Sequence, residues 1–212
     1  MIIKIPEWFF GIHSAVYIIC AMIGFLVSFY SYRSYILTKQ KNHHYLYLSF
    51  ASLSMGFLIL GVIELYSYLS ISQGMMEMFT TYSSFRDFGI WIYYACSIIS
   101  YSLLCLIYLP KEIKILPLFL PMWWKGFPYF HVISLFLMSY VIFRSTANWF
   151  VKRTTNTMLV FISFLLIGMY HLMLFFTSFS EWLFVGAHIS LILGFISLFW
   201  MIFRVSRKKG RF

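Results

Sequence analysis

Charged side chains are scarce in this sequence. Asp, Glu, Lys and Arg make up only 10% of the residues, whereas 62% are hydrophobic and 23% are aromatic. A water-soluble domain carries roughly 25% charged residues, because it needs them to cover its surface. With so few polar side chains, most of the exterior must be apolar, and lipid is the solvent that accepts such an exterior. The composition therefore predicts an integral membrane protein in contact with a lipid bilayer.

Cysteines and recognisable catalytic motifs are also scarce. The three cysteines all lie within apolar stretches and show no CxxC spacing, which argues against a disulfide framework and against a thiolate metal site. The chain has no Walker loop and no HExxH motif, and its apolar stretches contain no Gly-x-Ser. The last apolar stretch has no lysine that could carry a retinal Schiff base. No catalytic residue can be assigned, and the sequence leaves open whether the protein is an enzyme.

Long apolar runs predict about seven membrane-spanning helices. Crossing about 30 Å of hydrocarbon takes roughly 20 residues of helix. The expected helices cover residues 8–31, 45–70, 88–109, 113–124, 127–143, 157–178 and 181–203. The fourth is short and contains two prolines, and a turn at Lys125-Gly126 follows it. We expect a single all-α membrane domain over residues 1–212, although a re-entrant hairpin over 113–143 would reduce seven spans to five.

The distribution of lysine and arginine predicts the orientation. Thirteen of the sixteen basic residues fall in alternate connections or at the C-terminal end, and only Lys4, Arg86 and Lys125 fall on the other side. Basic connections stay in the cytoplasm, so the N-terminus is expected outside and the C-terminus inside. We expect the plasma membrane. The net charge of +10 comes from these short clusters and not from a basic face interleaved with aromatic residues, so nucleic acid is not an expected partner.

Five ionisable residues lie within the predicted spans. They are His13, Glu64, His131, His171 and His188. Each is placed a few residues inside the outer end of its helix, which at 1.5 Å per residue puts all five roughly 6–11 Å from the outer boundary. An ionisable residue inside a membrane is costly, so each is a candidate for function. Five helices could therefore bring these groups together in one outer layer.

Two kinds of site would use this layer. Imidazoles together with a carboxylate form the ligand set of a transition metal, and two facing histidines can hold a haem iron. For such a site the expected metal ligands are His171, His188 and His131, with His171 and His188 the expected neighbours because their helices are consecutive and antiparallel. For a ligand-binding pocket the expected residues are Glu64, His13, Arg86 and Asp87, the last two at its outer mouth. Glu64 could also support a histidine or accept a proton. Ordinary hydrogen bonds between helices are the alternative to both.

These observations leave two functional hypotheses. The first is a sensory or ligand-binding module, receptor-like in architecture, with a polar pocket that opens outward. The second is a haem- or metal-binding or structural subunit of a larger membrane complex that carries electrons. Other membrane subunits, or a cytoplasmic partner that contacts the basic C-terminus, are the expected protein partners.

Overall fold

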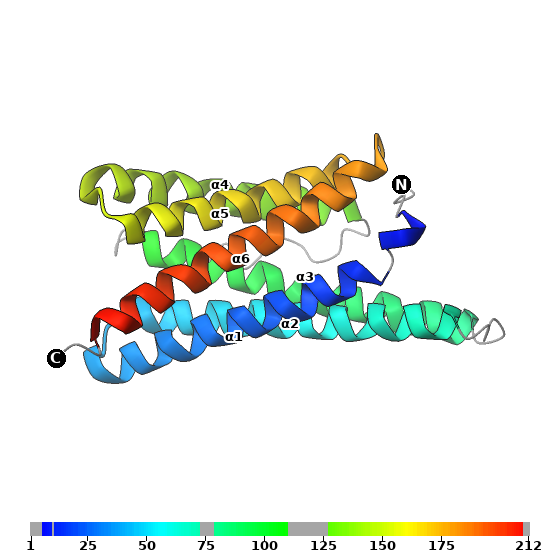
Figure 1. Ribbon diagram of the computed structural model, residues 1–212, viewed down its shortest axis with the longest axis horizontal. Helices are drawn as coiled ribbons and strands as arrows, with labels where there is room; N and C mark the ends of the chain where they lie inside the picture. The colour runs from blue at the N-terminus through cyan, green and yellow to red at the C-terminus, as the bar shows by residue number, and fades with distance from the viewer. Residues whose placement is uncertain (1–5, 10, 73–78, 110–126, 210–212) are drawn as a thin grey trace.

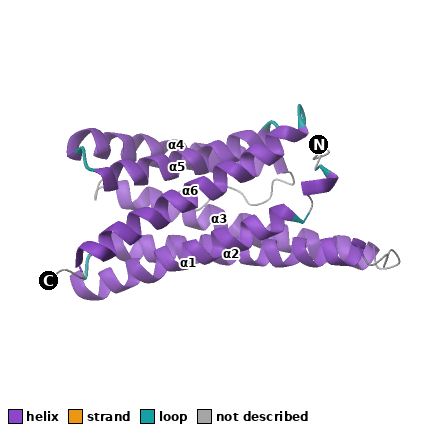
Figure 2. Cartoon of the chain, viewed as in Figure 1, coloured by secondary structure: helices purple, strands orange, loops and turns teal. Residues whose placement is uncertain are grey.

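The structure is a computed structural model that describes residues 6–9, 11–72, 79–109 and 127–209. These residues are helical apart from short turns (Figure 2). A 3₁₀ turn at Glu7–Phe9 precedes six α-helices. The helices are α1 (Ile12–Thr38), α2 (Lys41–Ser72), α3 (Phe79–Tyr108), α4 (Phe127–Lys152), α5 (Thr155–Phe175) and α6 (Glu181–Lys209). All six are long and apolar enough to cross a bilayer, so the described part of the chain is a membrane-type helical bundle.

The observed helices agree with six of the seven predicted spans, and most extend beyond the predicted bounds. α2 begins four residues earlier than expected, at Lys41, and α4 continues nine residues further, to Lys152. Hydropathy marks only the segment in hydrocarbon, whereas the helical hydrogen bonds continue into the interface. The predicted short helix over 113–124 and the turn at Lys125-Gly126 lie outside the described residues.

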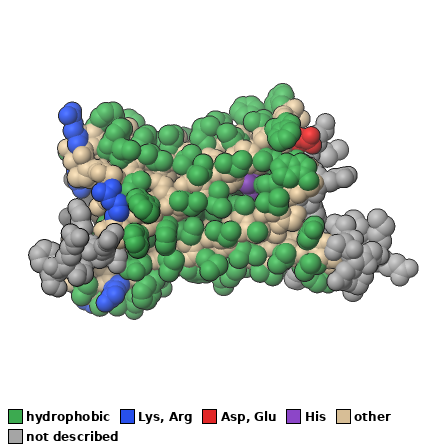
Figure 3. Space-filling model, in the orientation of Figure 1, with side chains coloured by type: hydrophobic (Ala, Val, Ile, Leu, Met, Phe, Trp, Pro, Cys, Tyr) green, Lys and Arg blue, Asp and Glu red, His purple; other side chains and the backbone are tan. Residues whose placement is uncertain are grey.

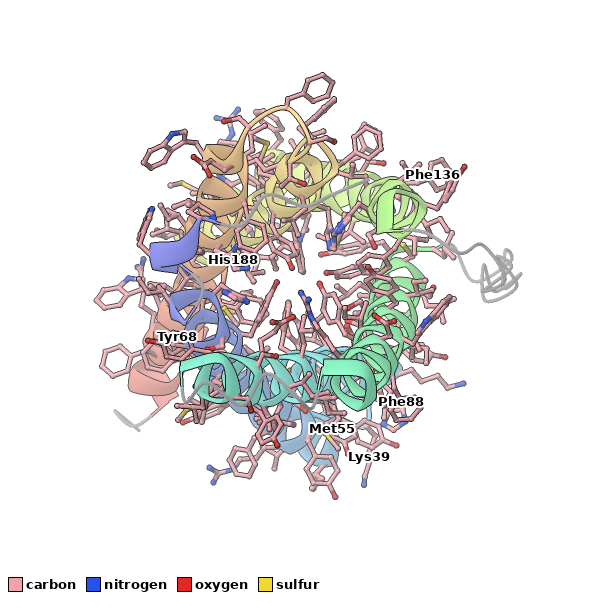
Figure 4. The ribbon with its side chains drawn as sticks, turned by 90° about the vertical axis from the view of Figure 1, so that its right-hand side faces the viewer. Lys39, Met55, Tyr68, Phe88, Phe136 and His188 are labelled. Atoms are coloured by element: carbon pink, nitrogen blue, oxygen red, sulfur yellow. The ribbon has the colours of Figure 1, made fainter. Side chains whose placement is uncertain are left out.

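The six helices form a closed ring. Each packs against the next one in the chain, and α6 returns to pack against α1. Figure 4 shows the bundle from one end, so that the ring of helices is seen down its axis. Phe88 and Phe136 lie on the outer side of the ring and His188 lies on its inner side. Both phenylalanines are highly exposed, whereas His188 is fully buried. The ring therefore turns an apolar surface outward and keeps its ionisable side chains inside.

Helix directions place the two termini at opposite ends of the bundle (Figure 1). α3 and α4 are consecutive but parallel: the ring of Tyr94 stacks on Phe130 at 3.9 Å, and further along both helices the hydroxyl of Tyr140 donates to the carbonyl of Tyr108 at 3.2 Å. As a result α1, α3, α4 and α6 all begin at one end, where α2 and α5 end. We call this the N-terminal end and the other the C-terminal end.

Two basic residues terminate helices at the C-terminal end. Lys39 and Arg153 both have positive φ, 53° and 47°. In this left-handed conformation the N–H of Lys39 reaches the carbonyl of Tyr35, and that of Arg153 reaches the carbonyl of Trp149. Such a cap satisfies a carbonyl that the ending helix leaves open. Both tight turns therefore put positive charge at the C-terminal end, where Figure 3 shows the basic side chains gathered.

Candidate functional site

All five ionisable residues predicted from the sequence lie inside the ring. They are His13, Glu64, His131, His171 and His188, and each whole residue, backbone included, is at most 4% exposed. Each lies in the half of its helix nearer the N-terminal end of the bundle. The structure divides them into two groups, one around Glu64 and one around His171, with tyrosine hydroxyls between them.

The first group is centred on the carboxylate of Glu64. Arg86 donates from Nε to Oε1 of Glu64 at 3.1 Å, and Nε2 of His13 lies 3.5 Å from Oε2. The Arg86 side chain is 36% exposed, whereas that of Glu64 is only 6% exposed. Arg86 thus connects the buried carboxylate to the surface of the bundle. Asp87, predicted beside Arg86 at the outer mouth, is exposed, and the guanidinium turns instead to Glu64.

His188 stands next to this group with one ring nitrogen engaged. Its Nδ1 lies 2.8 Å from the carbonyl of Phe184, and because a carbonyl can only accept, Nδ1 carries the proton. Nε2 is therefore a lone-pair acceptor, and this buried atom has no hydrogen-bond partner among the residues that the structure describes. A buried polar atom without a partner is uncommon in a native structure and calls for an explanation.

Aromatic rings enclose His188. Phe184 lies 4.4 Å away between ring centroids, Tyr17 at 5.1 Å and Phe9 at 5.5 Å. The rings of His13 and Tyr170 follow at 5.8 and 5.9 Å. These are contact distances for aromatic pairs. Nε2 of His188 is therefore a buried atom among closely packed rings.

The second group is a chain of three side chains from three helices. The hydroxyl of Tyr101 lies 2.7 Å from Nε2 of His171, and Nδ1 of His171 lies 3.0 Å from Nδ1 of His131. Both nitrogens of His171 are therefore hydrogen-bonded. If each imidazole carries one proton, the hydrogen bonds can run in either of two directions. Tyr101 donates to His171, which donates to His131, or His131 donates to His171, which donates to Tyr101. It holds α3, α4 and α5 together.

Three tyrosine hydroxyls lie between the two groups. The hydroxyl of Tyr170 is 3.3 Å from that of Tyr17 and 3.2 Å from that of Tyr93. The Tyr170 ring contacts His188 on one side and His171 on the other, at 5.9 and 4.9 Å. We call Tyr17, Tyr93 and Tyr170 the tyrosine triad. It links α1, α3 and α5 across the centre of the ring.

The structure gives no support to a transition-metal site. Among the described residues, no group of three or more His, Cys, Asp or Glu side chains is arranged to hold a metal. The predicted ligands are distributed differently: His171 pairs with His131, and His188 lies beside His13. The expected pair of His171 and His188 is bridged by the ring of Tyr170. His171 has also committed both nitrogens to hydrogen bonds, and a ligand needs one of them free.

The tyrosine triad is the part of the site that the sequence analysis missed. The chain has 16 tyrosines, and most are indistinguishable from residues of an interfacial aromatic belt. Spacing carries a usable signal for one of them. Tyr17 follows His13 by four residues and so shares its helix face, whereas Tyr170 is adjacent to His171, and neighbours in a helix do not share a face.

The fold and this buried layer define the class of protein: an integral membrane helical bundle with an ionisable interior. No protein-family model matches the chain, and neither the curated proteins nor the solved structures contain a match.

Proposed function

We propose that this protein is a sensory or ligand-binding membrane module whose site is the group of Glu64, His13 and His188, with Arg86 at its rim. The observation that carries the proposal is Nε2 of His188, a buried acceptor with no hydrogen-bond partner among the described residues, in a ring next to His13 and its carboxylate partner Glu64. Ionisable groups are retained inside membranes at a free-energy cost, and they commonly mark binding sites or proton pathways. The tyrosine triad connects this site to the opposite side of the ring.

We also propose that the site opens toward the outside of the cell and that the chain crosses the membrane seven times. Two observations support a seventh crossing: the termini lie at opposite ends of the bundle, and the consecutive helices α3 and α4 are parallel. The basic side chains at the C-terminal end of the bundle support a cytoplasmic location for that end.

A visible absorption spectrum and elemental analysis of gently purified protein test the class of function. A sensory or ligand-binding module is expected to be colourless and free of stoichiometric transition metal. A Soret band, or about one metal ion per chain, would overturn the proposal and favour the haem- or metal-binding subunit of a larger complex.

A binding experiment then tests the site itself. The unfolding temperature of the protein in bilayers is measured with a panel of small amines, alcohols and carboxylic acids and over a range of pH. A condition that stabilises the wild type but not His188→Asn supports the site, with His43→Asn at the C-terminal end as the matched control. If every condition shifts the wild type and His188→Asn equally, His188 does not belong to a binding site.

A further inference from the structure

The contacts of His13 require more protons than a neutral imidazole beside a carboxylate can supply. Nδ1 of His13 lies 3.2 Å from the carbonyl of Phe9, and Nε2 lies 3.5 Å from Oε2 of Glu64. Both facing atoms are acceptors when Glu64 is ionised, whereas a neutral imidazole has only one N–H to donate. In one of the two contacts, an unprotonated ring nitrogen of His13 would then face an oxygen atom, and their lone pairs would repel.

One additional proton satisfies both contacts. It can reside on His13, giving an imidazolium that donates to Phe9 and to Glu64, or on the carboxyl of Glu64. Arg86 decides between these forms, because its guanidinium donates to Oε1 and favours the ionised carboxylate. The proton therefore belongs on His13.

The surroundings of His13 are suited to a positive charge. The polarisable rings of Phe184 and Tyr17 lie 5.7 and 6.1 Å from the imidazole between centroids, both in edge-to-face geometry. Glu64 lies between the two cationic groups, His13 and Arg86. Among the described residues, the charged and titratable groups around His13 and His188 are these two rings themselves, Glu64 on α2, Arg86 on α3, Tyr17 on α1 and Tyr170 on α5.

We infer that the pair of His13 and Glu64 is a proton-binding site and that the proton is the ligand of this module. The inference rests on the proposed function and names the ligand, since the rings packed around His188 admit a proton without moving. Nε2 of His188, a buried lone pair, belongs to a ring whose centroid lies 5.8 Å from that of His13. Arg86, half-exposed, stands where the site meets the surface.

Solid-state NMR of the whole protein in lipid bilayers, with ¹⁵N-labelled histidine rings, tests this inference directly. At about pH 6, near the ordinary titration range of imidazole, one buried histidine should have both nitrogens protonated. That signal should disappear in His13→Asn, and Glu64→Gln should convert it to a neutral imidazole. His188 should be observed as a neutral ring protonated at Nδ1, identified by its loss in His188→Asn.

His43→Asn is the matched control and should leave both signals in place. The inference is overturned if all buried histidines of the folded wild type are neutral at about pH 6, or if Glu64→Gln leaves the His13 imidazolium unchanged. In either case a small molecule that stabilises the wild type but not His188→Asn would still support the binding module, so the two proposals fail separately. The wild-type spectrum alone decides the charge of the site if a variant does not fold.

Discussion

The two side chains of the Glu64–Arg86 ion pair differ in their exposure. Arg86 is 36% exposed and can return to water when its partner is lost, whereas the Glu64 side chain is 6% exposed and cannot. An ionised group left behind in a buried site is far more costly than one that can be hydrated. The two single substitutions that break this ion pair should therefore differ in their effect on stability.

We expect Arg86→Gln to lower the free energy of unfolding by on the order of 2 kcal/mol, an amount already reduced for the exposure of Arg86. Glu64→Gln should cost about 1 kcal/mol, since the amide keeps a hydrogen-bonding oxygen and Arg86 is rehydrated. Denaturant titration in lipid micelles measures both. An equal or larger cost for Glu64→Gln would contradict this account of the ion pair.

Tyr101 and Tyr140 offer a matched pair of hydroxyls. The Tyr101 hydroxyl meets His171 at 2.7 Å in the fully buried interior, whereas that of Tyr140 meets a carbonyl at 3.2 Å in a half-buried place. Tyr101→Phe leaves Nε2 of His171 buried without its partner, which should cost about 1–3 kcal/mol. Tyr140→Phe should cost less than 1 kcal/mol, because it removes a longer hydrogen bond from an only part-buried position. Equal losses in the same unfolding assay would count against a special role for the His171 chain.

At the scale of the helices, glycines set how closely neighbours approach. A Cβ on Gly61 in α2 would meet Ile18 at 2.9 Å and the backbone oxygen of Ser14 at 3.2 Å. A Cβ on Gly186 in α6 would meet only the flexible side chain of Met173, at 3.3 Å. Small residues let helix backbones pack closely in a membrane, where burial of apolar surface does not drive association. α1 and α2 thus depend on glycine at this contact.

Alanine at these two glycines should have different effects. Gly61→Ala must separate α1 from α2 and should destabilise the bundle by about 1–3 kcal/mol. Gly186→Ala should be close to neutral, because Met173 can change its rotamer. Unfolding measurements on both variants, with helix content checked by circular dichroism, test this. A neutral Gly61→Ala would show that the α1–α2 contact yields easily.

At the scale of the whole molecule, the charge distribution and the helix directions point to the same orientation. The basic side chains on the face shown in Figure 3 lie at the end where α1 and α4 finish, whereas the acidic surface visible there lies at the opposite end. Glu64 and the histidines lie in the half nearer that opposite end. With its basic end in the cytoplasm, as we propose, the protein holds its buried site in the outer half of the bundle.

Cysteine labelling in intact cells tests this orientation. Ser178→Cys lies beyond α5 at the N-terminal end, and Gln40→Cys lies in the turn between α1 and α2 at the C-terminal end; both positions are exposed. A membrane-impermeant maleimide should label Ser178→Cys in intact cells and Gln40→Cys only after permeabilisation. The unsubstituted chain is the background control. The reverse pattern would place the site on the cytoplasmic side.

Composition and hydropathy by themselves determined the class of this protein and the approximate course of six helices. Each residue's own polarity carries that information, because a span must satisfy its backbone internally and face lipid. The partners inside the ring were decided by the tertiary structure alone. Arg86 turns to Glu64 and not to Asp87, His171 meets His131, and the tyrosine triad occupies the centre. Helical spacing identifies the residues that share a face, but the neighbour across the bundle depends on the order, rotation and direction of the helices. Those are set by packing between segments far apart in the chain.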